Sequence, residues 1–138
     1  MDRTYSNPIY HINPGFILCG ESALEFMQMF SGYTNEQTIY VYRDADCTDD
    51  ISGYTVIPDH TGTIKYDERN GIKYTTFDQT INDMLSNSSL EDPQAIMEAL
   101  NEYLEINHGK DPEILPDNIP KYQYYKNESI DYYNDGED

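Results

Sequence analysis

Four aspartates within a seven-residue stretch are the side chains whose spacing most resembles a metal-binding loop: Asp44, Asp46, Asp49 and Asp50. Clustered carboxylates suit Ca²⁺ and Mg²⁺, but a calcium EF-hand loop beginning at Asp44 needs glycine at its sixth position and glutamate at its twelfth. Those positions hold Asp49 and Thr55. We therefore expect a solvated loop between two strands and no resident metal, with an opportunistic divalent-cation site as the alternative.

Nucleophilic catalysis would need a cysteine or serine beside a histidine that a third group orients. His11, His60 and His108 each adjoin turn residues, and neither Cys19 nor Cys47 has a neighbouring base in the sequence. The two cysteines are 28 residues apart with no closely spaced histidine pair, so they cannot complete a zinc site. No glycine-rich phosphate loop is present. We expect no catalytic residue, cofactor or metal, and predict that the chain is not an enzyme.

A glycine–serine turn and a pair of aspartates give a limited resemblance to nucleotidyltransferases. Gly20 and Ser22 follow one predicted strand, and Asp44 and Asp46 follow another. In that family the glycine and serine are adjacent and the aspartates follow much sooner, whereas here Glu21 intervenes and the gap is longer. We therefore expect no nucleotidyl transfer by this chain.

Tyrosine is the most unusual feature of the composition, with 14 tyrosines and no tryptophan. Five of them lie in the last 17 residues among acidic side chains. Tyrosine offers a large contact area at low entropic cost and is enriched at protein interfaces. We predict a partner-binding surface made of Tyr122, Tyr124, Tyr125, Glu128, Asp131, Tyr132 and Tyr133. A disordered tail with incidental aromatic residues is the alternative.

The charge balance limits the classes of partner. Acidic residues outnumber basic ones 26 to 8, for a formal net charge of −18. Such a chain repels phosphate backbones and anionic lipid headgroups. Its basic residues are scattered along the sequence and form no cluster, as five of them illustrate: Arg3, Arg43, Lys65, Arg69 and Lys73. We expect a protein partner, with no direct binding to nucleic acid and no membrane contact.

Hydropathy and cysteine usage predict a location. The longest uninterrupted apolar stretch is residues 16–19, far short of a membrane span, and the N-terminus lacks a basic-then-apolar signal pattern. We therefore expect a cytoplasmic protein, in which Cys19 and Cys47 are reduced thiols.

Hydrophobic periodicity predicts an α/β (α+β) fold with a mixed sheet of about five strands flanked by three or four helices. Apolar runs predict strands at residues 16–19, 38–43, 54–57, 63–66 and 72–75, the last two joined by a hairpin turn at Asn70-Gly71. Helical spacing predicts helices at 22–30, from a Thr76/Gln79 capping box to about 86, and from Asp92-Pro93 to about 107. This gives one domain, residues 1–107, with an extended N-terminal arm.

Residues 108–138 differ in character from the domain before them. Pro112, Pro116 and Pro120 are four residues apart, and the sequence then consists largely of Tyr, Asn and acidic residues. We predict an acidic Tyr-rich C-terminal extension, a short helix plus a tail. On this interpretation, residues 121–138 can be removed without loss of the fold.

The order of several short motifs over residues 16–107 resembles the antitoxin domain of AbiEi-type proteins from type IV toxin–antitoxin systems. The motifs are Gly20-Glu21-Ser22-Ala23-Leu24 at a helix start, Gln79-Thr80-Ile81-Asn82-Asp83-Met84 in a second helix and Glu98-Ala99-Leu100 in a third. The family carries an "R-T-x-x-D-L/M" helix beside a helix bearing "E-A-L". The resemblance implies an antitoxin-like protein without enzymatic activity that counteracts a nucleotidyltransferase-type (AbiEii-like) toxin.

Two departures from the family pattern affect what the resemblance implies. Family members usually begin with a winged-helix domain that binds their promoter, but only 15 residues precede the first predicted strand here, so promoter binding is not implied. Gln79 also replaces the usual arginine. The runner-up function is an acidic nucleic-acid mimic that inhibits a phage-defence nuclease, of the anti-CRISPR or anti-restriction type. A third interpretation is a small domain with no toxin partner.

Overall fold

The computed structural model describes residues 12, 15–32, 39–43, 54–57 and 64–134 and shows an α/β fold. A mixed sheet of five strands is combined with four α-helices, which confirms the expected fold class. The elements are β1 (Phe16–Leu18), α2 (Gly20–Phe26), β2 (Ile39–Arg43), β3 (Tyr54–Ile57), β4 (Tyr66–Arg69), β5 (Ile72–Thr75), α3 (Phe77–Ser86), α4 (Pro93–Ile106), the 3-10 turn η2 (Pro116–Asn118) and α5 (Ile119–Asn134).

The sheet has the strand order β3-β2-β1-β5-β4. β1 is antiparallel to β2 and parallel to β5, β2 and β3 are parallel, and β4 and β5 form an antiparallel hairpin. β1 occupies the centre because all three of its residues are apolar and buried, as a strand covered on both faces requires. β4 lies at an edge, where its four exposed residues, Tyr66 to Arg69, face water.

Alternation along the central strands divides their side chains between two hydrophobic clusters. One cluster contains Phe16, Leu18, Val41 and Tyr74 together with residues of α2, among them Phe26. The other contains the alternate strand residues Ile17, Tyr42 and Ile57 and extends through α3 and α4 to α5. Helices α3, α4 and α5 therefore enlarge the second cluster, and Met27 packs against both clusters.

The hairpin turn at Asn70-Gly71 is confirmed, but the strand before it lies closer to the turn than expected. Both turn residues have positive φ, 54° and 81°, as a two-residue hairpin of this kind requires. Arg69 pairs with Ile72, so the turn fixes the register and β4 begins only at Tyr66. Hydropathy favoured residues 63–66 because the actual strand is exposed and charged, which leaves no apolar alternation to detect.

The first helix begins and ends earlier than residues 22–30. α2 ends at Phe26, and Gln28 then has a φ of 63°, in the left-handed region that stops an α-helix. Phe30 is still buried in the core cluster, although it lies in a bend after the helix. The sequence predicted a helix up to residue 30 because a compact turn after α2 brings Phe30 back to the core, where a further turn of helix would also have placed it.

α3 begins with half of the expected capping box. The Thr76 hydroxyl accepts a hydrogen bond from the Gln79 amide at 3.3 Å. The Gln79 side chain does not return to Thr76, because the Thr76 N–H already donates to the Lys65 carbonyl at 3.1 Å. Instead, Gln79 Oε1 accepts from the Lys65 amide at 3.2 Å, and Gln79 Nε2 donates to Asp83 at 2.8 Å. Gln79 thus fastens α3 to the segment that enters β4.

α4 matches its prediction most closely. The Asp92 side chain accepts from the Ala95 amide at 3.1 Å, and Pro93 occupies the first turn. The stripe formed by Ala95, Ile96, Ala99 and Leu100 is fully buried.

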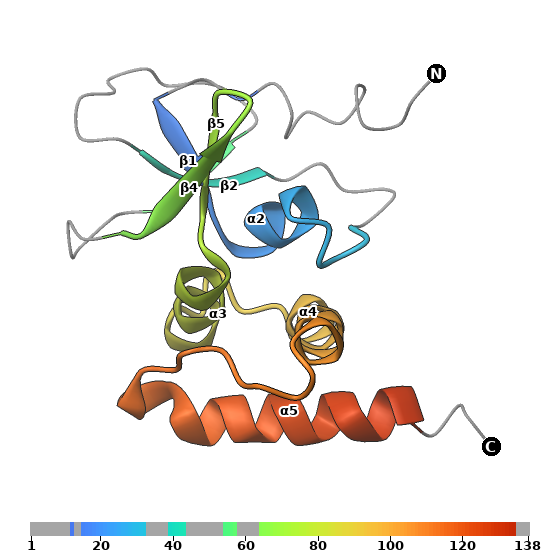
Figure 1. Cartoon of the computed structure of the whole chain (residues 1–138). Helices are drawn as coiled ribbons and strands as arrows, with labels where there is room; N and C mark the ends of the chain where they lie inside the picture. Colours follow the sequence, from blue (N-terminus) through green and yellow to red (C-terminus); the bar gives the residue numbers. More distant parts are fainter. Residues whose placement is uncertain (1–11, 13–14, 33–38, 44–53, 58–63, 135–138) are drawn as a thin grey trace.

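The C-terminal segment differs most from the expectation of a short helix plus a tail. Residues 119–134 form α5, a helix of 16 residues that lies across α4 on the side away from the sheet (Figure 1). Tyr122 and Tyr125 belong to the same core cluster as Leu100. In the part of the chain that the structure describes, no helix is both long and apolar enough to cross a membrane.

Candidate partner-binding surface

Helix α5 separates the predicted contact residues into an inward and an outward set. Tyr122 and Tyr125 point inward and are only 2% and 5% exposed, so they cannot contact a partner while the helix is docked. The sequence prediction treated all five tyrosines as equivalent, whereas the structure separates these two from the exposed Tyr124 and Tyr132. The side chain of Tyr133 lies outside the described part of the structure.

The outward set consists of Tyr124, Glu128, Asp131 and Tyr132, all exposed. Their spacing of i, i+4, i+7 and i+8 places them on one face of the helix. Tyr124 and Tyr132 are 59% and 67% exposed, and eight residues of helical rise separate them by about 12 Å. We call these four residues the outer face of α5.

The inner side of α5 is held by polar groups as well as by rings. Ser129 lies one turn beyond Tyr125, is buried, and donates to the Met97 carbonyl of α4 at 2.9 Å. Buried Asn118, one turn before Tyr122, donates to the Asn82 side chain of α3 at 3.0 Å. Tyr122, Tyr125 and Ser129 therefore form the buried stripe of α5, and Asn118 of the 3-10 turn η2 continues this stripe before the helix begins.

Two carboxylates flank this stripe, one on each side. Glu91 accepts from Lys121 Nζ and from the Tyr125 hydroxyl, both at 2.5 Å. Asp111 accepts from the Tyr122 hydroxyl at 2.6 Å and from Lys126 Nζ at 2.8 Å. We call these two sets of contacts the carboxylate pins; each consists of one carboxylate and the lysine and tyrosine that donate to it. Each pin joins a lysine and a tyrosine that are four residues apart on α5.

The pins change the ionisation of the groups they join. Hydrogen bonds from the lysines and tyrosines lower the pKa values of Glu91 and Asp111 below their ordinary range. Burial, followed by the hydrogen bond to a carboxylate, raises the pKa values of Tyr122 and Tyr125 well above that of a free phenol. At neutral pH the carboxylates are therefore charged and the phenols are neutral donors.

The pins also determine which charges remain on the outer surface of α5. The helix carries two lysines and two acidic residues, and both lysines form ion pairs with acids from other segments. The exposed carboxylates of Glu128 and Asp131 lie between the two outer rings in the sequence. The outer face is therefore acidic and aromatic, although the helix as a whole has no formal net charge.

The motifs of the antitoxin resemblance lie in the interior of the fold. Thr80 and Ile81 are buried, and the Thr80 hydroxyl contacts that of Thr75 at 2.5 Å. Ala99 and Leu100 are also buried, while Glu98 accepts a hydrogen bond from the Ser31 amide at 2.6 Å. These motifs hold α3 and α4 in place and do not line the outer face.

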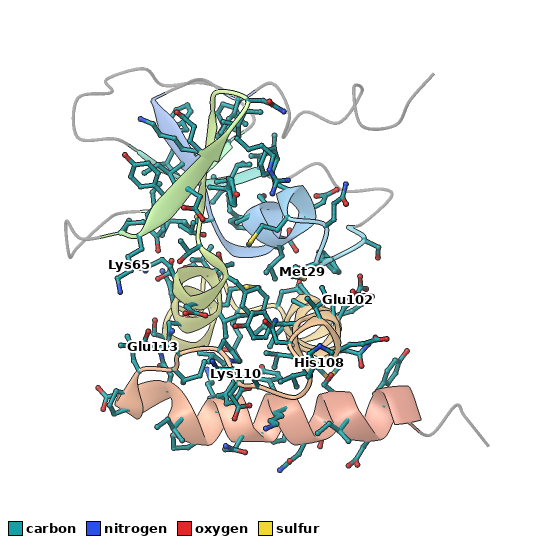
Figure 2. The ribbon with its side chains drawn as sticks, viewed as in Figure 1. Met29, Lys65, Glu102, His108, Lys110 and Glu113 are labelled. Atoms are coloured by element: carbon teal, nitrogen blue, oxygen red, sulfur yellow. The ribbon has the colours of Figure 1, made fainter. Side chains whose placement is uncertain are left out.

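The side chains considered for catalysis or metal binding do not form a site in the described ranges. Cys19 is a buried free thiol whose pKa is raised well above its ordinary value, mainly by burial. His108 is exposed in the turn that follows α4 (Figure 2). The described residues contain no group of three or more His, Cys, Asp or Glu side chains arranged to hold a metal. His11, His60, Cys47 and the four aspartates of residues 44–50 lie outside the described residues.

Comparison with models of known protein families and with curated proteins finds no match to this sequence. Interpretation of the outer face therefore rests on the residues of this chain.

Proposed function

We propose that this chain is an antitoxin-like protein without enzymatic activity, which counteracts a nucleotidyltransferase-type toxin in the cytoplasm by binding a protein partner. The outer face of α5 is the observation that carries the proposal. It presents two exposed tyrosine rings and two carboxylates on a helix that is fixed to the rest of the fold.

The chemistry of the outer face suits a basic protein. Tyrosine rings are frequent anchors in protein interfaces because they bury a large area at the cost of few rotatable bonds. Glu128 and Asp131 would attract lysine and arginine side chains, which speeds encounter and penalises acidic competitors. The preformed helix adds to this, since the partner need not order a flexible segment.

The motif order supports the antitoxin class in particular. In the family, the helix with the "R-T-x-x-D-L/M" pattern lies beside the helix bearing "E-A-L". Here Ile81 and Met84 of α3 belong to one hydrophobic cluster with Ala99 and Leu100 of α4. The matching motifs thus contribute to a common core, as the resemblance implies.

An acidic nucleic-acid mimic is the second candidate, and charge favours it. The chain carries a formal net charge of −18, and two of its acidic residues, Glu128 and Asp131, are exposed on the outer face of α5. A protein of this kind would occupy the nucleic-acid groove of a phage-defence nuclease. Its binding would weaken strongly with salt and would be competed by nucleic acid.

Affinity capture from the native host separates these candidates. The bait is the full chain at about 0.15 M salt, a concentration at which unpaired surface charges act over about 8 Å. A parallel capture uses the double variant Tyr124→Ala/Tyr132→Ala, and Gln123→Ala serves as control because Gln123 is exposed on α5 away from the outer face. Each capture is repeated at high salt and with added duplex DNA and RNA.

The proposal predicts capture of a nucleotidyltransferase by the wild-type chain and by Gln123→Ala, with loss in the double variant. A nuclease that nucleic acid displaces would support the mimic instead. Capture that is equal for all three baits would overturn the assignment of the outer face. If co-expression of the chain failed to restore growth to cells poisoned by the captured transferase, the antitoxin function itself would be excluded.

A further inference from the structure

The rotation of α5 about its own axis decides which of its tyrosines a partner meets. A turn of one residue position, about 100°, would bring a different set of side chains to the surface. Tyrosines 122, 124, 125 and 132 are chemically alike, so ring identity alone specifies no rotation. Other contacts of α5 must therefore determine its rotation.

The buried stripe selects the rotation only in part. Its hydrophobic members are the two rings of Tyr122 and Tyr125, and the stripe is completed by Asn118 and Ser129. Hydrophobic burial is non-directional, and other exposed apolar residues compete for the inner position. Ile119 and Ile130 are 44% and 41% exposed on the same helix.

The carboxylate pins act from both sides of the stripe. Lys121 and Lys126 are five residues apart, which separates them by about 140° around the helix axis. Glu91, in the segment between α3 and α4, forms an ion pair with Lys121 on one side of the stripe. Asp111, in the segment after α4, forms an ion pair with Lys126 on the other side. A roll in either direction would stretch one of the two pins.

Each pin is directional because it fixes two donors on one carboxylate. Glu91 uses one oxygen for Lys121 and the other for Tyr125. Asp111 Oδ1 accepts from both Tyr122 and Lys126. Lys121 also donates to the Leu85 carbonyl at 3.3 Å, at the end of α3. Charge-assisted hydrogen bonds of this kind are stronger than neutral ones and, unlike apolar contacts, have a preferred direction.

We infer that Glu91 and Asp111 are positioning residues for partner recognition: they set the roll of α5 and thereby present Tyr124 and Tyr132 while withholding Tyr122 and Tyr125. The inference rests on the proposed function, because it treats the outer face as the recognition surface. Neither carboxylate belongs to that face. Their effect on a partner is transmitted through the orientation of the helix.

Nitration of tyrosine by tetranitromethane, mapped by peptide mass spectrometry, tests the inference on the free protein. In the wild-type chain, nitration at pH 8 is expected at Tyr124 and Tyr132, with Tyr122 and Tyr125 protected. Glu91→Gln should increase the nitration rate of Tyr125 roughly tenfold and that of Tyr122 much less, and Asp111→Asn should produce the opposite preference. Glu102→Gln, on the exposed side of α4, is the matched control and should change none of these rates.

Loss of the hydrogen bond by itself would also make the phenol that it joins more reactive. A roll is therefore distinguished by a changed nitration rate at Tyr124 and Tyr132 in the same two variants. Circular dichroism and the midpoint of urea unfolding show whether each variant is folded under the nitration conditions. Unchanged nitration in both variants would overturn the inference, as would equal exposure of Tyr122 and Tyr125 in each. Because this experiment needs no partner, its failure would leave the capture experiment on Tyr124 and Tyr132 unaffected.

Discussion

Helices α4 and α5 lie against each other but are attached to the fold by different forces. α4 inserts a stripe of aliphatic side chains, Ala95, Ile96, Ala99 and Leu100, into the core. α5 is attached by two tyrosine rings, a serine and two carboxylate pins. Aliphatic burial supplies stability without direction, whereas hydrogen bonds and ion pairs supply direction at modest net energy. The difference suggests that α4 maintains the fold and α5 presents a surface.

Removal of residues 121–138 is the most disruptive test of this comparison. The sequence by itself predicts an intact domain, but the structure places Tyr122 and Tyr125 in the core cluster shared with α4. At roughly 1.5–3 kcal/mol for each large buried side chain, the two rings alone contribute about 3–6 kcal/mol. We therefore expect a large loss in the free energy of unfolding, measured by urea denaturation. A truncated chain as stable as the full one would show that α5 is only an appendage.

Leu100→Ala tests the aliphatic half of the comparison. Leu100 is fully buried, so removal of its side chain leaves a cavity and should cost about 2–5 kcal/mol of unfolding free energy. Glu102→Ala, on the exposed side of α4, is the control and should change stability by less than about 0.5 kcal/mol. Equal effects for both variants would mean that α4 is not packed as described.

Tyr122→Phe tests whether the hydroxyl groups contribute beyond the rings. The substitution keeps the buried ring but removes the hydrogen bond to Asp111. We expect a loss of about 1–2 kcal/mol in unfolding free energy, because that carboxylate is partly exposed to water. Tyr124→Phe is the matched control on the outer face and should be nearly neutral. A neutral Tyr122→Phe would indicate that the rings alone hold the helix.

Acid should weaken the pins before it weakens the aliphatic core. The pKa values of Glu91 and Asp111 are lowered in the folded protein, so their contribution to stability is complete above the unfolded values of about 4.3 and 3.9. It is lost as the pH falls through the lower, folded values. The stability difference between wild type and Glu91→Gln/Asp111→Asn should therefore be present at pH 7 and shrink below about pH 4.

The same titration of Glu128→Gln/Asp131→Asn is the control for general charge effects. With a net charge of −18, protonation also relieves repulsion across the whole chain, and only the difference between matched variants isolates the pins. A difference that stayed constant from pH 7 to pH 3 would contradict the assignment of the pKa shifts to these contacts.

Short sequence patterns correctly predicted the helix caps, the turn and the strands whose positions depend on residues close together in the chain. The caps at Thr76 and Asp92 and the Asn70-Gly71 turn depend only on neighbours in the chain, and the structure confirms them. The apolar strands pair with distant strands, but their own residue types are enough to locate them. The sequence patterns failed for elements whose position depends on contacts with another segment of the chain. β4 is exposed and charged, and its place in the sheet depends on β5 and the turn.

The C-terminal helix shows the same limit more clearly. Residues 118, 122, 125 and 129 have helical spacing, but Asn, Tyr and Ser are not the residue types by which an apolar stripe is recognised. The pairs Lys121/Tyr125 and Tyr122/Lys126, each four residues apart, were the available signal for the pins. Their acceptors lie 30 and 15 residues away from the lysines that they bind, so no local pattern could identify them.

The amino-acid sequence alone is enough to predict the fold class, the acidic charge that disfavours nucleic-acid partners and the concentration of tyrosines near the C-terminus. These properties follow from composition and from periodicity within single elements. Which tyrosines are buried and which form the outer face is known only from the folded chain, because this division depends on the roll of α5. Contacts from Glu91 and Asp111 set that roll, and such contacts exist only once distant segments of the chain have packed together.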